Sequence, residues 1–292
     1  MLGKKKNSEQ RTDFVYAGKT QTKILLEQPS ESNHYISQKS YLYGYDVAQL
    51  ISKKSFAETL LLLFTGELPA AANARLLERL MIALINLGPR HPAVKASMTA
   101  GVSKSNAEHL LPIGLSVLGG KENGAQEVAE AISFIYANID KSPQFLADSL
   151  LKESAEELAQ HSGEFHLVAG FGNYYGSIDE LTQAHADAVL SPTVEDKDQH
   201  CTYIDWGLAF VERLESANIG ILKTGLAAMV FCHLGIAARE AVGLYQLLCA
   251  PGIFAHGVEQ THKPITAMPM LSDEQHFYQQ QQTLVGDRAN DK

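Results

Sequence analysis

The sequence predicts a protein built almost entirely of α-helices. Along most of the chain, apolar residues recur three and four positions apart, as the buried face of a helix requires. Glycine and proline close these apolar segments, as they commonly do at helix ends. Two segments near the C-terminus are apolar nearly all round, which indicates helices inside the protein or at an interface between subunits. We therefore expect an all-α fold.

The beginning of the chain differs from the rest because it is polar and mixed. We expect residues 1–40 to form a partly ordered N-terminal extension, in which TKILLEQ (residues 22–28) is a short strand. The helical pattern begins within residues 45–69, where a glycine and a proline close the segment, and it is repeated at residues 71–89.

The middle of the chain is expected to hold helices interrupted by one glycine-rich segment. Asn123 followed by Gln126 has the pattern of a capping box at the start of a helix. HSGEFHLVAGFGNYYGS (residues 161–177) contains four glycines, and we expect it to be a loop with a short extended piece. Helices are expected at residues 92–102, 106–118, 124–139, 143–160, 178–190 and 200–216, followed by the two apolar helices at 219–236 and 238–260.

Composition and charge exclude several classes of function. The 292 residues carry a formal net charge of −9 with a pI near 5.6, so a nucleic-acid-binding surface is not indicated. The most apolar segments are interrupted by lysine, histidine and proline, and no signal-peptide pattern is found, so no membrane span is expected. The three cysteines are widely spaced and the histidines are scattered. We therefore expect a cytoplasmic protein with no disulfide framework and no metal.

Four glycine-containing segments are weak signals one by one but specific together. They are GGKENGA (119–125), VAGFGNYYGS (168–177), ESANIGILKTG (215–225) and LCAPGIFAHGVEQ (248–260). In this order, and after YGYDVAQLISKKSFAETLLLLFTGELP (43–69), they resemble the citrate synthase superfamily, in particular its short branch of citryl-CoA lyases. The resemblance extends over about residues 40–262.

The resemblance implies a two-domain helical fold and a homodimer. A large domain would contain residues 41–119 and 218–292, and a small domain, residues 120–217, would cover a cleft. In this family, two histidines and an aspartate form or cleave a carbon–carbon bond between a CoA thioester and an α-keto acid. The matching positions hold Glu122, Asn173 and Gly220. The resemblance therefore implies that the catalytic set is absent.

The residues that would hold the substrate are replaced as well. Leu181 and Cys249 stand where the family has carboxylate-binding arginines, Leu87 stands where it often has a histidine, and Tyr174 is a further pocket position. The seven arginines fall at none of these positions: 11, 75, 79, 90, 213, 239 and 288. An added acid at Glu122 would repel a tricarboxylate, so we do not expect citrate or oxaloacetate as the ligand.

A possible cofactor follows from the resemblance alone. The family's loop around the adenine end of CoA is matched by Val168, Gly170, Phe171 and Gly172, so CoA or an acyl-CoA is the implied cofactor. The glycines are equally explained by fold geometry, and this alternative stays open. His256 and Glu259 are also retained, and we expect His256 to be structural.

Two functions remain as hypotheses. The first is a non-catalytic homologue that acts as a partner or regulatory subunit of another enzyme. The second is an enzyme with rebuilt chemistry on an acyl-CoA, in which Glu122 is a general base and Asn173 an oxyanion donor, with Lys121, Tyr174 and Tyr175 as further candidates. Glu122 is otherwise a solvated loop acid and Asn173 a turn residue. Cys249 is expected to be a buried, inert thiol.

Overall fold

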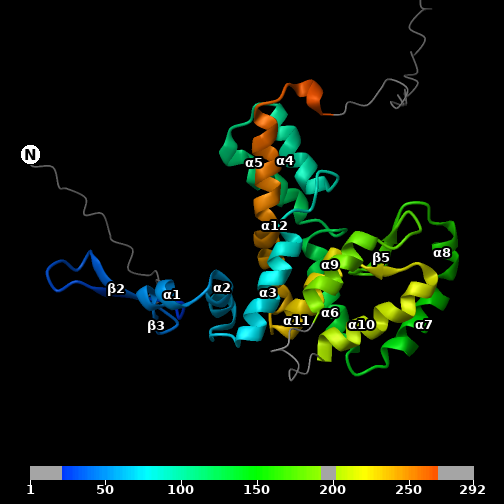
Figure 1. Cartoon of the computed structure of the whole chain (residues 1–292), viewed down its shortest axis with the longest axis horizontal. Coiled ribbons are helices and arrows are strands. Elements are labelled where there is room, and N and C mark those ends of the chain that lie inside the picture. The colour runs from blue at the N-terminus through cyan, green and yellow to red at the C-terminus, as the bar shows by residue number, and fades with distance from the viewer. Residues whose placement is uncertain (1–21, 192–201, 269–292) are drawn as a thin grey trace, which may run out of the picture. The chain divides into compact units, whose positions relative to one another are not determined.

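The computed structural model describes residues 22–191 and 202–268, which form two compact units (Figure 1). The first unit contains the described residues up to 78 together with 234–236, and the second contains the others. The expected division into a large domain (residues 41–119 and 218–292) and a small domain (residues 120–217) stays a prediction.

The first unit begins with a small antiparallel sheet. Its strands, in the order β1-β2-β3, are Leu25–Pro29, Ser37–Leu42 and Tyr45–Asp46, and two helices follow, α1 (Val47–Lys53) and α2 (Phe56–Thr65). The expected strand at residues 22–28 is confirmed with a small shift, and its partner β2 was not foreseen. Residues 1–21 of the expected extension lie outside the described part of the chain.

The helices of this unit start and end at residues suited to those places. The carboxylate of Asp46 accepts hydrogen bonds from the first turn of α1. Ser55 and Glu58 form a reciprocal capping box at the start of α2. Gly66 ends α2 with a φ of 80°, a conformation that a side chain disfavours. The expected helical segment at 45–69 is therefore two helices.

The second unit is mainly helical. Its helices are the end of α3 (Ala71–Leu84), α4 (Pro92–Val102), α5 (Ala107–Leu118), α6 (Ala125–Asn138), α7 (Pro143–Glu153), α8 (Ala155–Gln160), α9 (Glu180–Leu190), α10 (Thr202–Leu214), α11 (Lys223–His233) and α12 (Ala238–Thr261), with 3-10 turns at Glu215–Ala217 and Ile265–Ala267. The expectation of a mainly helical protein is confirmed.

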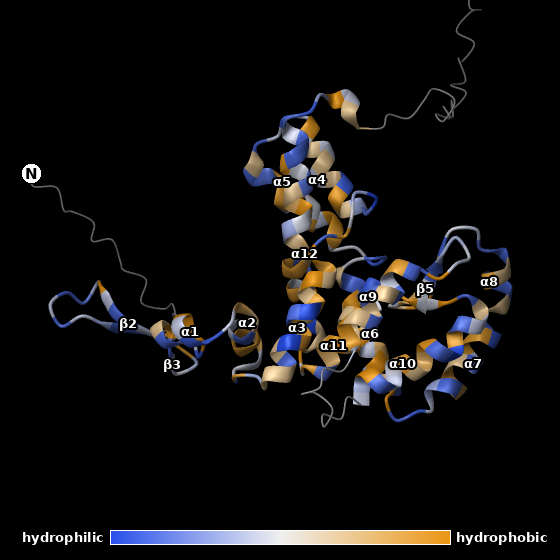
Figure 2. Ribbon diagram, in the orientation of Figure 1, coloured by the Kyte–Doolittle hydropathy of each residue, from blue (hydrophilic) through white to orange (hydrophobic). Residues whose placement is uncertain are grey.

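The centre of this unit is α12. It contacts α4, α5 and α6, and α6 also packs against α11 (Figure 1). Hydrophobic residues recur along α11 and α12 (Figure 2), and nearly every residue of α11 is buried. Among the described residues, α12 alone has the length and apolar composition that could cross a membrane, which is weak evidence because buried core helices share both properties.

A second three-stranded sheet replaces the loop expected at residues 161–177. Its antiparallel strands, in the order β4-β5-β6, are Glu164–Val168, Phe171–Tyr174 and Gly220–Ile221. Phe171 is fully buried on the central strand and packs against Phe134 and Phe210, with Trp206 stacked on Phe210. Burial of these rings anchors the sheet to α6 and α10.

Candidate functional site

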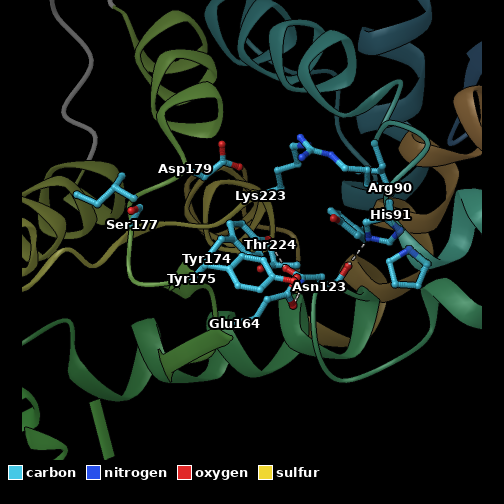
Figure 3. Close-up of a pocket in the computed structure, with 14 residues that line it drawn as sticks. Arg90, His91, Asn123, Glu164, Tyr174, Tyr175, Ser177, Asp179, Lys223 and Thr224 are labelled. Atoms are coloured by element: carbon cyan, nitrogen blue, oxygen red, sulfur yellow. Dashed lines mark hydrogen bonds between the residues drawn. The ribbon is translucent and has the colours of Figure 1, made fainter. Parts of the chain in front are cut away.

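A cavity of about 430 Å³ lies within the second unit (Figure 3). Ligand sites in proteins commonly have volumes of this order. Its walls come from segments far apart in the sequence: the turn before α4, the loop before α6, the β4–β5 hairpin with the turn after it, the start of α11, and α12. Side chains from five segments therefore converge on this cavity.

His91 is fixed by both of its ring nitrogens. As the N-cap of α4, its Nδ1 accepts a hydrogen bond from the Ala93 N–H, so Nε2 carries the proton and donates to the Asn123 carbonyl at 3.1 Å. Burial and the positive charge of Lys223 lower the pKa of His91, although the Asn123 carbonyl opposes them. His91 is therefore a neutral side chain that joins two walls of the cavity.

Asn123 connects two further polar groups of the cavity, Glu164 and Tyr174. Its Nδ2 donates to Glu164 at 2.8 Å, and its Oδ1 accepts from the Tyr174 hydroxyl at 2.6 Å. The expected capping box with Gln126 is wrong: Gly124 is the N-cap of α6, and Asn123 has a φ of 54° that turns its side chain into the cavity. Asparagine tolerates this conformation better than most residues.

Glu127, in the first turn of α6, is a buried acid that ties three chain segments together. Its carboxylate accepts hydrogen bonds from the Asn123 N–H at 2.8 Å, His166 Nδ1 at 2.6 Å and the Gly170 N–H at 3.0 Å. Burial acts to raise the pKa of Glu127, but these hydrogen bonds and the His166 charge outweigh it and lower that pKa. The hydrogen bond to Glu127 raises the pKa of His166.

Two cationic side chains line the cavity. Arg90 comes from the turn before α4, and Lys223 is the first residue of α11 (Figure 3). Arg90 is not one of the matched pocket positions, but the turn at residues 88–91 brings it to the cavity wall. The opposing carboxylates in the lining are Glu164 and Asp179.

The three positions that match the family's catalytic residues lie outside the cavity lining. Glu122 is exposed. Asn173 is buried in β5, where its Oδ1 accepts from the Gly176 N–H at 3.3 Å. Gly220 is buried in β6, and a Cβ there would lie 2.7 Å from Ile178. These residues do not converge on a common point of the cavity.

The expected pocket positions divide into two groups. Leu87, Tyr174 and the further candidate Tyr175 line the cavity. Leu181 and Cys249 do not line it. Leu181 is exposed, and Cys249 is buried as expected, where burial raises the pKa of its thiol to about 12. Burial also raises the pKa of Tyr174 well above its usual value.

The residues matched to the CoA loop are largely used by the fold. The Gly170 N–H donates to Glu127, and its carbonyl accepts from the Leu222 N–H at 2.9 Å. Gly172 lies on the central strand, and a Cβ there would collide with the Phe165 carbonyl. Phe171 is buried in the aromatic core, and of the four expected positions Val168 alone is partly exposed.

The remaining candidates have structural partners or lie on the surface. Nε2 of His256 lies 3.1 Å from the Asn86 side chain, and Glu259 pairs with Lys263 at 2.8 Å. Lys121 is exposed and outside the cavity lining. Within the described residues, no three histidine, cysteine, aspartate or glutamate side chains are placed to hold a metal ion.

Two cavity residues that were not predicted as site residues can be recognised from the sequence. His91 directly precedes a proline at an expected helix start, which is an N-cap position. Lys223 is the single lysine, arginine or acid in the apolar segment 219–236, and a charged residue in so apolar a helix is unusual. Glu164 and Thr224 carry no such signal in the sequence.

The backbone is similar to solved structures. Citryl-CoA lyase from Hydrogenobacter thermophilus aligns with a TM-score of 0.67 and 19% identity, over 90% of this chain and 94% of that one. This chain has the citrate synthase-like fold. Citrate synthase from Thermotoga maritima MSB8 aligns with a TM-score of 0.53 and 14% identity, over 94% and 95% of the two chains.

A longer protein contains the same citrate synthase-like fold. ATP citrate lyase from Methanothrix soehngenii, in complex with citrate and coenzyme A, aligns with a TM-score of 0.61 and 15% identity over 91% of this chain, which spans 44% of that lyase. No protein-family model matches the sequence, and no curated protein is similar to it at a significant level.

Proposed function

We propose that this chain is a non-catalytic protein with a citrate synthase-like fold, in which the cavity of the second unit binds a small ligand without converting it. One observation carries the proposal. The positions of the family's catalytic groups, Glu122, Asn173 and Gly220, lie outside the cavity lining. The cavity itself is lined by cations, tyrosines and asparagine, residues that recognise a ligand through charge, stacking and hydrogen bonds.

The protonation states of the lining groups also favour binding over proton transfer. Both nitrogens of His91 are engaged in hydrogen bonds. The Tyr174 hydroxyl is bonded to Asn123, and its raised pKa keeps it protonated near neutral pH. The carboxylate of Asp179 caps α9 through the N–H groups of its first turn. His91 therefore has no ring lone pair left to accept a proton, while Tyr174 and Asp179 are held by hydrogen bonds within the protein.

The test is turnover of the substrates of the family. We expect the purified full-length chain to release no CoA from acetyl-CoA with oxaloacetate, and to cleave no citryl-CoA, above the rate without protein. Free thiol release measures the first reaction and oxaloacetate formation the second. A citrate synthase and a citryl-CoA lyase run in parallel serve as positive controls.

The opposite result would support the rebuilt enzyme. Turnover that is lost in Glu122→Gln or Asn173→Ala would contradict the proposal and assign chemistry to those residues. The same preparations are titrated with CoA in a calorimeter. We expect no CoA binding, because Gly170 and Gly172 are already engaged in internal hydrogen bonds and close contacts. A micromolar Kd for CoA, about −8 kcal/mol, would instead support CoA as a cofactor of this chain.

We further propose that the partner of this chain is a second copy. Ile113 and Val117 form an exposed apolar pair on α5, and Leu247 and Phe254 form another on α12. Each pair lies on one face of its helix because the spacings are four and seven residues. The two helices are neighbours, and exposed apolar faces of this kind mark protein interfaces.

Charge on the proposed interface should separate the copies. We expect a wild-type dimer in light scattering after gel filtration and a folded monomer for Leu247→Asp, since a buried unpaired carboxylate opposes association. Phe145→Asp on α7, an equally apolar and more exposed position, is the control and should remain dimeric. A monomeric wild-type protein would contradict this proposal.

A further inference from the structure

The start of α11 forms part of the cavity wall, and the residue before it cannot cap the helix with its side chain. The residue before the helix, Leu222, has no side-chain oxygen to accept hydrogen bonds from the first turn. The first N–H groups of a helix have no partner within the helix, and the helix dipole adds a partial positive charge there. This end of α11 therefore favours an anion. A helix N-terminus alone does not make a binding site, so a second observation is needed.

Thr224 supplies that second, independent indication. This residue of the first turn is 1% exposed and lines the cavity, and its hydroxyl has no hydrogen-bond partner in the described structure (Figure 3). A buried polar group without a partner destabilises the folded protein. The hydroxyl of Thr224 is thus a donor at the cavity wall that no described residue uses.

Two positively charged side chains lie near the start of α11. Lys223 precedes Thr224, and the Arg90 side chain extends toward this region of the cavity (Figure 3). Neither side chain forms an ion pair with the described residues. The charge of Lys223 is effective in the cavity, since it contributes to lowering the pKa of His91. Lysine, arginine, a hydroxyl and a helix N-terminus are together the donors that phosphate groups use.

The balance of charge limits the ligand. A phosphate monoester carries about −1.5 to −2 charges at pH 7 and can pair with both Lys223 and Arg90, although Glu164 and Asp179 leave the lining as a whole without net positive charge. A tricarboxylate would bring additional negative charge toward Glu164 and Asp179. Tyr174, Tyr175 and Tyr245 also line the cavity, so the body of the ligand would meet aromatic rings.

We propose that Lys223, Thr224 and Arg90 bind the phosphate group of a small phosphate monoester at the start of α11. This assignment rests on the proposed function, because it names the ligand class for a cavity that binds without turnover. It also gives the unpartnered hydroxyl of Thr224 a role in the protein.

The test uses two probes that differ only in their anionic group, phenyl phosphate and benzoate. Each is titrated into the full-length protein by calorimetry at constant ionic strength. We expect phenyl phosphate to bind at least about tenfold more tightly than benzoate, since phosphate presents more acceptor oxygens to the same donors. Lys223→Ala should weaken phenyl phosphate by about 10- to 100-fold, and Lys121→Ala, an exposed lysine outside the cavity, should leave it unchanged.

Thr224→Val separates ligand binding from a structural role. Valine has the shape of threonine without the hydroxyl, so this variant should bind phenyl phosphate about tenfold more weakly. Without ligand, its melting temperature should equal or exceed that of the wild type, because an unpartnered buried hydroxyl has been removed. A purely structural hydroxyl would produce the opposite pattern.

Three results would overturn the inference. They are no saturable heat at about 10 mM phenyl phosphate, affinity unchanged in both Lys223→Ala and Thr224→Val, and benzoate binding as tightly as phenyl phosphate. The experiments distinguish failure of the phosphate site from failure of the proposed function. Turnover of acetyl-CoA with oxaloacetate, or of citryl-CoA, would refute the proposed function whether or not phenyl phosphate binds. If neither turnover nor phenyl phosphate binding is observed, only the phosphate site is refuted.

Discussion

Replacing Glu127 with alanine is expected to lower the free energy of unfolding by about 3–5 kcal/mol, the usual cost of removing one partner from a buried ion pair. Glu127 is 2% exposed and accepts hydrogen bonds from Asn123, His166 and Gly170. Without it, two backbone N–H groups and the ring of His166 lose their acceptor inside the protein. The loops that carry Asn123 and Gly170 would then no longer be held together.

Chemical denaturation measures this effect, with Glu130→Ala as the matched control. Glu130 lies one turn further along α6, is exposed, and within the described part of the chain accepts a hydrogen bond from Gln126 at 3.2 Å. We expect that control to stay within about 0.5 kcal/mol of the wild type, as surface substitutions usually do. A Glu127→Ala protein as stable as Glu130→Ala would show that the buried carboxylate does not hold the site together.

The pH dependence of the same difference provides a second readout. The lowered pKa of Glu127 gives stability above about pH 4.5, its unfolded value, which is lost as the pH falls through the folded pKa. The raised pKa of His166 gives stability fully present below about pH 6.5, which is lost as the pH rises through the folded pKa; Glu122 and Glu164 add to this shift. Wild type and Glu127→Ala should therefore differ most between about pH 4.5 and 6.5.

The helical part of the fold could be predicted because it depends on local periodicity. The spacing of apolar residues in α6, and the glycine that ends α2, are sufficient to place those helices. The sheet β4-β5-β6 could not be predicted because β6, at Gly220–Ile221, pairs with a strand almost fifty residues earlier in the chain. Short pairings over such distances leave no periodic pattern in the sequence.

The candidate site was predicted less well, for a related physical reason. Motif alignment places Asn173 and Gly220 by their order in the chain, but neighbouring residues of a strand point to opposite faces. Tyr174 reaches the cavity whereas Asn173 is buried beside it. Arg90 and Lys223 reach the cavity through a turn and a helix start, and neither is a position that the family resemblance marks as functional. Their position depends on packing between segments that are distant in the sequence.

Gly170→Ala is expected to be strongly destabilising, and it tests why this glycine is present. Gly170 has a φ of 83°, and a Cβ there would lie 2.6 Å from Gly225 Cα and 3.1 Å from Ala131 Cβ. A left-handed conformation costs a residue with a side chain about 1–2 kcal/mol, and overpacking adds about 1–3 kcal/mol. The neighbour that must move is backbone of α11, which is itself buried.

Thermal unfolding and CoA titration of the same variant distinguish the two explanations of the glycine. If Gly170 serves the fold, Gly170→Ala melts at a clearly lower temperature, while the exposed control Glu130→Ala on α6 melts close to the wild type. If Gly170 serves a cofactor, Gly170→Ala keeps its melting temperature and loses CoA affinity. We expect the first result, because the close approach of Gly170 to Gly225 and its hydrogen bonds to Glu127 and Leu222 already account for the glycine without any ligand.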